Sequence, residues 1–202
     1  WEDGAMALLA DADPSIALGA LDGRYRPTVA PLIDHLSEPA LNRARLHVEV
    51  EWLIHLTDHR VVRGVRTLSD DEKAQLRAIP ASFGPAEIAE LAATVRVTQH
   101  DVKAVEYLLK ARLAEIAPDP VDQGLAELVH FCCTSEDINN LSYALMVQGA
   151  IRDVWLPKAT TLVAALAALA ADLASVPLLV KNTFSSLLAF FTFSAASAIG
   201  TE

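Results

Sequence analysis

An uninterrupted apolar stretch constrains the fold of this chain more than any other feature. It runs from Leu162 to Ala170, and the next charged residue is Asp172. A helix that is apolar on all sides must be covered by other helices or by lipid. The run is shorter than the roughly 20 residues that a membrane span needs, and its small side chains permit close packing. We therefore predict a central helix of a bundle and favour this over a membrane span.

The rest of the sequence also has helical periodicity, and strand-like alternation is nearly absent. Between Pro39 and His59, the side chains of Leu46, Val50 and Leu53 form one row at helical spacing. Further helices are predicted at 69–79, at 85–117 with a polar interruption at 98–101, at 134–155 and at 158–174. The predicted fold class is therefore all-α.

Charge and cysteine content exclude several classes of protein. The formal net charge of -10 argues against nucleic acid or an anionic membrane as the main partner. The two cysteines, Cys132 and Cys133, are adjacent, so no disulfide framework is predicted and a reducing cytoplasm fits best. His130 lies beside them, but no second ligand pair follows at zinc spacing, and we predict no metal site.

A polar segment from Cys133 to Asn140 immediately precedes another apolar helical pattern. One interpretation is an ordinary capped helix, with Thr134 or Ser135 as N-cap and two acidic residues in its first turn. The other is a site for a small anion, because the free backbone N–H groups of a helix N-terminus attract negative charge. Spacing alone leaves both interpretations open.

Three separated stretches, in the same order, resemble the adenylosuccinate lyases of the fumarase/aspartase superfamily. The resemblance extends over about residues 17–179. The stretches are Asp22-Gly23-Arg24-Tyr25, the segment Thr98 to Tyr107 with its His-Asp pair, and His130 to Leu145 with its Thr-Ser-Glu-Asp sequence.

The resemblance implies β-elimination of fumarate from adenylosuccinate, which gives AMP, and from the succinylated aminoimidazole carboxamide ribotide of purine biosynthesis. It implies no metal or organic cofactor, a purine nucleotide substrate, and a homotetramer whose sites are assembled from three subunits. It assigns substrate binding to Arg24, Tyr25, Gln99, His100, Asp101, Thr134 and Ser135.

The chemistry of these side chains suits that assignment. Arg24 can bind a phosphate or carboxylate through two parallel hydrogen bonds. His100 can donate to an anionic oxygen, and Asp101 can orient His100 or cap the second half of a broken helix. Lys103 and Glu106 are predicted to form a structural pair at i, i+3 spacing.

The sequence departs from the family pattern at two places. Gln99 stands where asparagine is usual, which keeps the amide. After Leu179 the chain continues as Val180-Lys181-Asn182-Thr183, and the motifs that supply the general-acid histidine and the general-base serine are absent. We therefore expect no catalytic residue here and a truncated lyase that is inactive alone. The alternative is a non-catalytic helical module that binds nucleotide or another subunit.

The same reasoning predicts four segments along the chain. They are an irregular extension at 1–16, an N-terminal helical lyase domain at 17–133, the start of a central helical bundle at 134–179, and a divergent apolar tail at 180–202.

Overall fold

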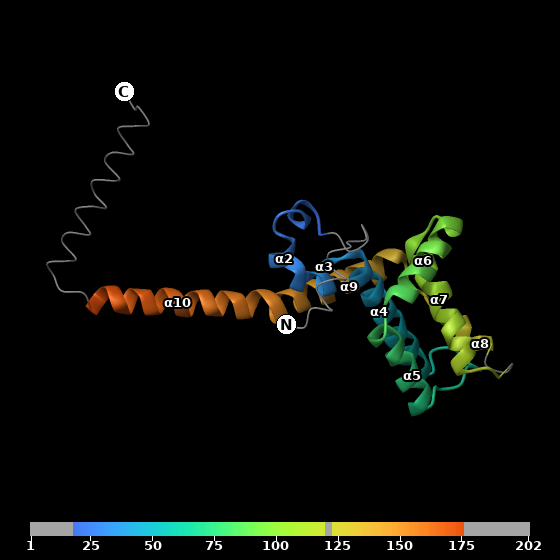
Figure 1. Cartoon of the computed structure of the whole chain (residues 1–202). Helices are drawn as coiled ribbons and strands as arrows, with labels where there is room; N and C mark the ends of the chain where they lie inside the picture. The colour runs from blue at the N-terminus through green and yellow to red at the C-terminus, as the bar shows by residue number, and fades with distance from the viewer. Residues whose placement is uncertain (1–17, 120–122, 176–202) are drawn as a thin grey trace, which may run out of the picture. The chain divides into compact units, whose positions relative to one another are not determined.

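The computed structural model describes residues 18–119 and 123–175, and these contain helices and no strand. This confirms the all-α prediction. In chain order the elements are η2 (Ala20–Asp22), α2 (Arg26–Val29), η3 (Ala30–Leu32), α3 (Ile33–Leu36), α4 (Glu38–Asp58), α5 (Asp70–Ala81), α6 (Pro85–Thr98), α7 (Asp101–Ile116), α8 (Gln123–Ala126), α9 (Ser135–Gly149), the π-helical segment η5 (Ala150–Trp155) and α10 (Leu156–Ser175) (Figure 1).

The chain divides into two compact units, Trp1–Val154 and Trp155–Glu202. The four segment boundaries predicted from the sequence stay predictions, and the segments 1–16 and 180–202 lie outside the described residues. Within residues 18–119 and 123–175, one helical stretch, Ser135–Ser175, is long and apolar enough to cross a membrane by length and composition alone, which is weak evidence for a span.

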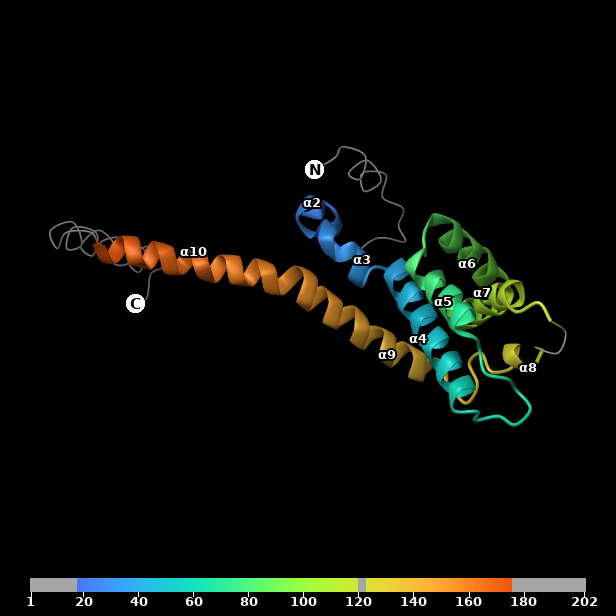
Figure 2. The ribbon, with the colours of Figure 1, turned by 90° about the horizontal axis from the view of Figure 1, so that it is seen from below.

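Helix α4 is the central element of the first unit and contacts α3, α5, α7 and α9. The views in Figures 1 and 2 agree in placing α4 beside α5 and α9. The predicted row of Leu46, Val50 and Leu53 is completely buried, as are Leu76 of α5 and Leu109 of α7. Burial of apolar area therefore fixes α4 between its neighbours.

The capping box predicted at the start of α5 is confirmed. The Ser69 hydroxyl accepts from the backbone N–H of Glu72 at 3.2 Å, and the Glu72 carboxylate accepts from the backbone N–H of Ser69 at 2.7 Å. The Arg66 guanidinium also donates to this carboxylate, and it lowers the pKa of Glu72 to about 2. The helix runs past the predicted end and includes Pro80 in its last turn.

The long helix predicted to begin at Pro85 is two helices. Gln99 ends α6 in the left-handed region, with φ 53°, and His100 is extended, with φ -148°. The polar interruption seen in the sequence therefore corresponds to a break between two helices, where the chain changes direction. His100 caps α7, with Nδ1 accepting from the backbone N–H of Lys103 at 3.1 Å, so the capping role suggested for Asp101 belongs to its neighbour.

None of the residues of α10 is buried. Its larger apolar side chains, Leu162, Val163, Leu166, Leu169 and Leu173, are each more than half exposed. Within the second unit the described residues, 155–175, contain only this helix and Trp155 before it, so they do not supply the cover that its apolar sequence predicts.

Candidate functional site

Two of the three predicted motifs lie at helix N-termini next to α4. The first is the break before α7. There the Thr98 hydroxyl donates to the carbonyl of His100 at 3.1 Å, and the Gln99 amide donates to the carbonyl of Arg96 at 2.9 Å. These local bonds hold the break in shape, while Gln99, His100 and Asp101 remain exposed. The side chains are therefore accessible to a ligand.

The second motif is the start of α9, where Thr134 is the N-cap. Its backbone N–H and hydroxyl both donate to the Asp137 carboxylate, at 2.7 and 2.8 Å. These hydrogen bonds from Thr134 hold the pKa of Asp137 below its ordinary value. The geometry is that of a capped helix, and it shows that this position accommodates a carboxylate. The Ser135 hydroxyl makes no hydrogen bond within the described part of the chain.

Arg45 of α4 joins these two motifs. Its guanidinium contacts the Asp101 carboxylate at 2.7 Å and donates to the side-chain oxygen of Asn139, in α9, at 2.9 Å. A third bond goes to the side-chain oxygen of Asn42 at 3.0 Å. The Arg45 side chain is only 4% exposed, so the guanidinium at this contact between α4, α7 and α9 has little access to water and depends on these partners.

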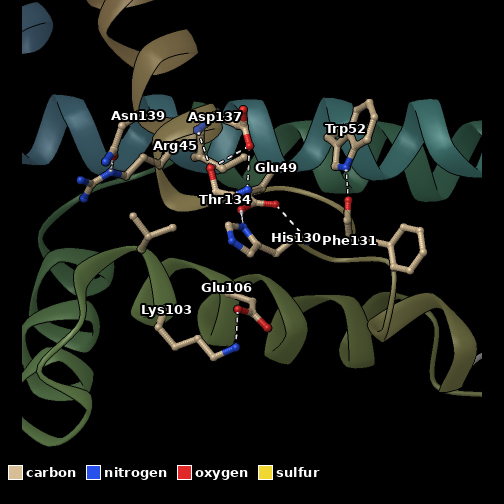
Figure 3. A network of polar contacts seen from close by, with 12 residues as sticks. Arg45, Glu49, Trp52, Lys103, Glu106, His130, Phe131, Thr134, Asp137 and Asn139 are labelled. Atoms are coloured by element: carbon tan, nitrogen blue, oxygen red, sulfur yellow. Dashed lines mark hydrogen bonds and ion pairs between the residues drawn. The ribbon is translucent and has the colours of Figure 1, made fainter.

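Residues of α4 also fix the turn that leads into α9. Glu49 accepts from the backbone N–H of His130 at 3.1 Å and lies 2.5 Å from Nδ1 of the same residue. The indole N–H of Trp52 donates to the carbonyl of Phe131 at 2.9 Å. Figure 3 shows His130 between Glu49 above it and Glu106 of α7 below it. The turn that precedes Thr134 is thus anchored to α4 at two points.

The pKa values of three acidic residues in this region are shifted, and the direction of the shift depends on the partner of each carboxylate. Burial raises the pKa of Glu49 above its ordinary value, more than the contacts with His130 lower it. Burial also acts to raise the pKa of Asp101, but the Arg45 guanidinium and a backbone N–H hold it below its usual range. Glu106 is likewise buried, yet Lys103 at 2.7 Å and Lys110 at 3.0 Å lower its pKa. The predicted Lys103–Glu106 pair is confirmed.

A groove of about 730 Å³ runs between α4 and α9 beside this turn. Its lining includes Trp52 and His55 of α4 and Cys133, Asp137 and Leu141. The groove therefore reaches the carboxylate that Thr134 holds. Among the described residues, no group of three or more His, Cys, Asp or Glu side chains is placed to hold a metal ion.

Arg24 and Tyr25 lie apart from the other predicted site residues. They precede α2, and the Arg24 guanidinium is 5.7 Å from the centre of the Tyr25 ring. Both views of the chain place α2 away from α6 and α7 (Figures 1 and 2). The structure thus brings together the motifs around His100 and Thr134 within one copy of the chain, but not the third motif.

Sequence analysis missed Arg45, Glu49 and the contact of His130 with Glu49. The available signal was the position of Arg45 and Glu49 beside the apolar row of α4, where a charged residue requires a buried partner. Arg45 precedes Leu46 and Glu49 precedes Val50, and both charged residues are buried with them.

Comparison with known proteins shows the family to which the chain belongs. A family model described as lyase matches residues 23–181. The chain therefore belongs to this lyase family.

Within it, the chain is 42% identical over 166 residues to adenylosuccinate lyase of Escherichia coli (strain K12), 42% identical over 167 residues to that of Haemophilus influenzae, and 38% identical to that of Vibrio cholerae. Each match covers 82% of this chain and 36% of the relative, so the chain spans about a third of the length of these proteins. The resemblance to adenylosuccinate lyase is confirmed.

Proposed function

We propose that this chain forms the substrate-holding part of an adenylosuccinate lyase site, where fumarate is eliminated from a succinylated purine nucleotide or its ribotide precursor. The observation that carries the proposal is the Arg45 contact, which holds Asp101 and Asn139 within 2.7 and 2.9 Å of one guanidinium. It keeps the His100 break and the start of α9 next to each other.

The chemistry required of this part is anion binding. In a β-elimination, a proton leaves the carbon beside a carboxylate while the C–N bond breaks and the nitrogen gains a proton. Negative charge builds up on the carboxylate, and hydrogen-bond donors fixed beside it stabilise the transition state. Thr134 already donates two hydrogen bonds to the Asp137 carboxylate. A substrate carboxylate bound here would take the place of that side chain.

The proposed roles follow from this geometry. Thr134 and Ser135 bind a carboxylate of the succinyl group, His100 donates to an anionic oxygen, and Gln99 and Asp101 position His100. Arg24 and Tyr25 bind the substrate in a site shared with other copies, which is supported by their separation from α7 in the views of one copy. The protein requires no metal or organic cofactor under this proposal, and it acts in the cytoplasm.

The first test is fumarate release from adenylosuccinate by the purified chain, followed by absorbance, together with calorimetric binding of fumarate. We expect binding without turnover, and turnover when the remaining portion of a full-length relative is added. Thr134→Ala should weaken fumarate binding, whereas Ser69→Ala should not. Each removes a capping hydroxyl worth about 1 kcal/mol, so the second variant controls for stability. Turnover by the chain alone would contradict the assigned holding role, and absence of fumarate binding would contradict the proposal itself.

We also infer that α10 associates with α10 of other copies in a homotetramer. The inference is supported by its exposed leucines, because soluble proteins rarely leave a long apolar surface uncovered. Sedimentation velocity should show a species larger than a monomer, and a monodisperse monomer would contradict it. Recovery of the chain only in detergent, with the membrane fraction, would favour a membrane span instead.

A further inference from the structure

We propose that Glu49 is a positioning residue of this site, which fixes the His130 ring with Nδ1 toward α4 and so holds the turn that positions the start of α9 for a bound carboxylate. The identity of that ligand rests on the proposed function, whereas the link between Glu49 and His130 rests on the structure alone. Glu49 is not among the site residues predicted from the sequence, and it belongs to none of the three sequence motifs.

Glu49 is an unusual residue for its surroundings. It is 0% exposed and lies between Val48 and Val50 on a helix whose neighbouring side chains form the apolar core. Burying a carboxylate among apolar groups is costly unless hydrogen bonds compensate. Both of its oxygens reach His130, one the backbone N–H at 3.1 Å and the other Nδ1 at 2.5 Å. Both oxygens of the Glu49 carboxylate therefore bind the same residue, one through the backbone and the other through the ring of His130.

The partner requires such an anchor because its backbone is strained. His130 has φ 64° and Cys132 has φ 59°, values that residues with a Cβ rarely adopt. Each costs on the order of 1–3 kcal/mol and persists only where the surroundings impose it. Glu49 holds the first of these residues, and the hydrogen bond from Trp52 to Phe131 lies between the two.

The turn held by Glu49 leads into the start of α9. Without this anchor the short segment between His130 and Thr134 would be free to shift, so the position of Thr134 depends on it. His130 also helps to lower the pKa of Asp137 electrostatically, after the larger effect of the hydrogen bonds from Thr134. Figure 3 shows the Glu49 carboxylate above the His130 ring, on the side of Thr134 and α4.

The experiment is nitrogen NMR of the full chain labelled with 15N-histidine, with and without fumarate. In the unmodified chain we expect a protonated Nδ1 for His130, and a shift of its ring signals when fumarate binds at the start of α9. In Glu49→Gln we expect the Nδ1 signal to lose its distinct position, and fumarate affinity to fall about tenfold, the effect of roughly one hydrogen bond to a charged group.

Glu106→Gln is the matched control. Glu106 is also a buried carboxylate, but its hydrogen bonds go to Lys103 and Lys110. This variant should lose stability as Glu49→Gln does, while Nδ1 of His130 keeps its distinct signal and the fumarate affinity stays within twofold of that of the unmodified chain.

The outcomes separate this proposal from the proposed function. An unprotonated Nδ1 in the unmodified chain overturns the proposal, and this measurement does not depend on whether any variant folds. Equal changes of the His130 signals in both variants overturn it too, because a general loss of structure would then explain them. A chain that binds no fumarate, but whose His130 ring responds only to Glu49→Gln, overturns the proposed function and leaves the role of Glu49 in place.

Discussion

Replacement of Arg45 by methionine is expected to lower the free energy of unfolding by about 3 kcal/mol. Methionine fills much of the same space but removes the bonds to Asp101, Asn139 and Asn42. The two asparagine oxygens then lose a charged donor, and methionine offers them no donor in its place. The loss is below that of a fully buried ion pair, because the Asp101 side chain is 56% exposed and can be hydrated.

The same substitution at Arg77 is the control. Arg77 also links two helices, since it donates to Glu51 of α4 at 2.7 and 2.8 Å, but its side chain is 51% exposed. Water can replace this pair, so Arg77→Met should change the urea midpoint little. Urea unfolding with an unchanged m-value gives the comparison. Equal destabilisation by both substitutions would show that Arg45 does no more than an ordinary surface arginine.

The Arg45 substitution should also separate the two motifs. Without it, no described contact joins the Asp101 carboxylate to α9. Binding of fumarate is therefore expected to weaken along with stability, while Arg77→Met should leave it unchanged. Loss of stability without loss of binding would indicate that the α9 terminus binds the anion independently of the His100 break.

Local sequence signals predicted much of this fold correctly. The Ser69–Glu72 capping box, the helix start at Pro85 and the N-cap at Thr134 depend on residues a few positions apart. The buried row on α4 depends on helical spacing alone. Such features are visible in one sequence because the partners that create them are near neighbours in the chain.

The contacts that position the candidate site are of a different kind. Arg45 and Asn139 are 94 residues apart, and Glu49 and His130 are 81 apart. Helical periodicity gives no information on which distant residue faces a buried charge. The pattern of α4 shows only that Arg45 and Glu49 lie beside an apolar row, so it predicts that they need partners without identifying them.

The break between α6 and α7 is an intermediate case. The polar residues at this point were visible in the sequence, but a left-handed Gln99 was not, because only a few residues with a Cβ adopt φ 53°. Helices α6 and α7, on either side of the break, pack against each other. The ligand site proposed at the break therefore depends on tertiary packing, although its residues are consecutive.

Replacement of Leu53 by alanine should lower the free energy of unfolding by about 3 kcal/mol. Leu53 is 0% exposed, and it lies in the cluster that α4 forms with α5, α6 and α7. Alanine leaves a cavity that rigid helices on several sides cannot fill. The measurement is urea unfolding, with the midpoint and the m-value compared with those of the unmodified chain.

Leu169→Ala is the matched substitution in α10, where the leucine is 55% exposed. At low protein concentration it should change the urea midpoint little, because no cavity forms at an exposed position. If copies associate through α10, its effect should grow with protein concentration, since the association itself then adds to stability. A large effect of Leu169→Ala at every concentration would mean that this leucine is covered within the single chain. An effect of Leu53→Ala as small as that of an exposed leucine would contradict the central place of α4 in the core.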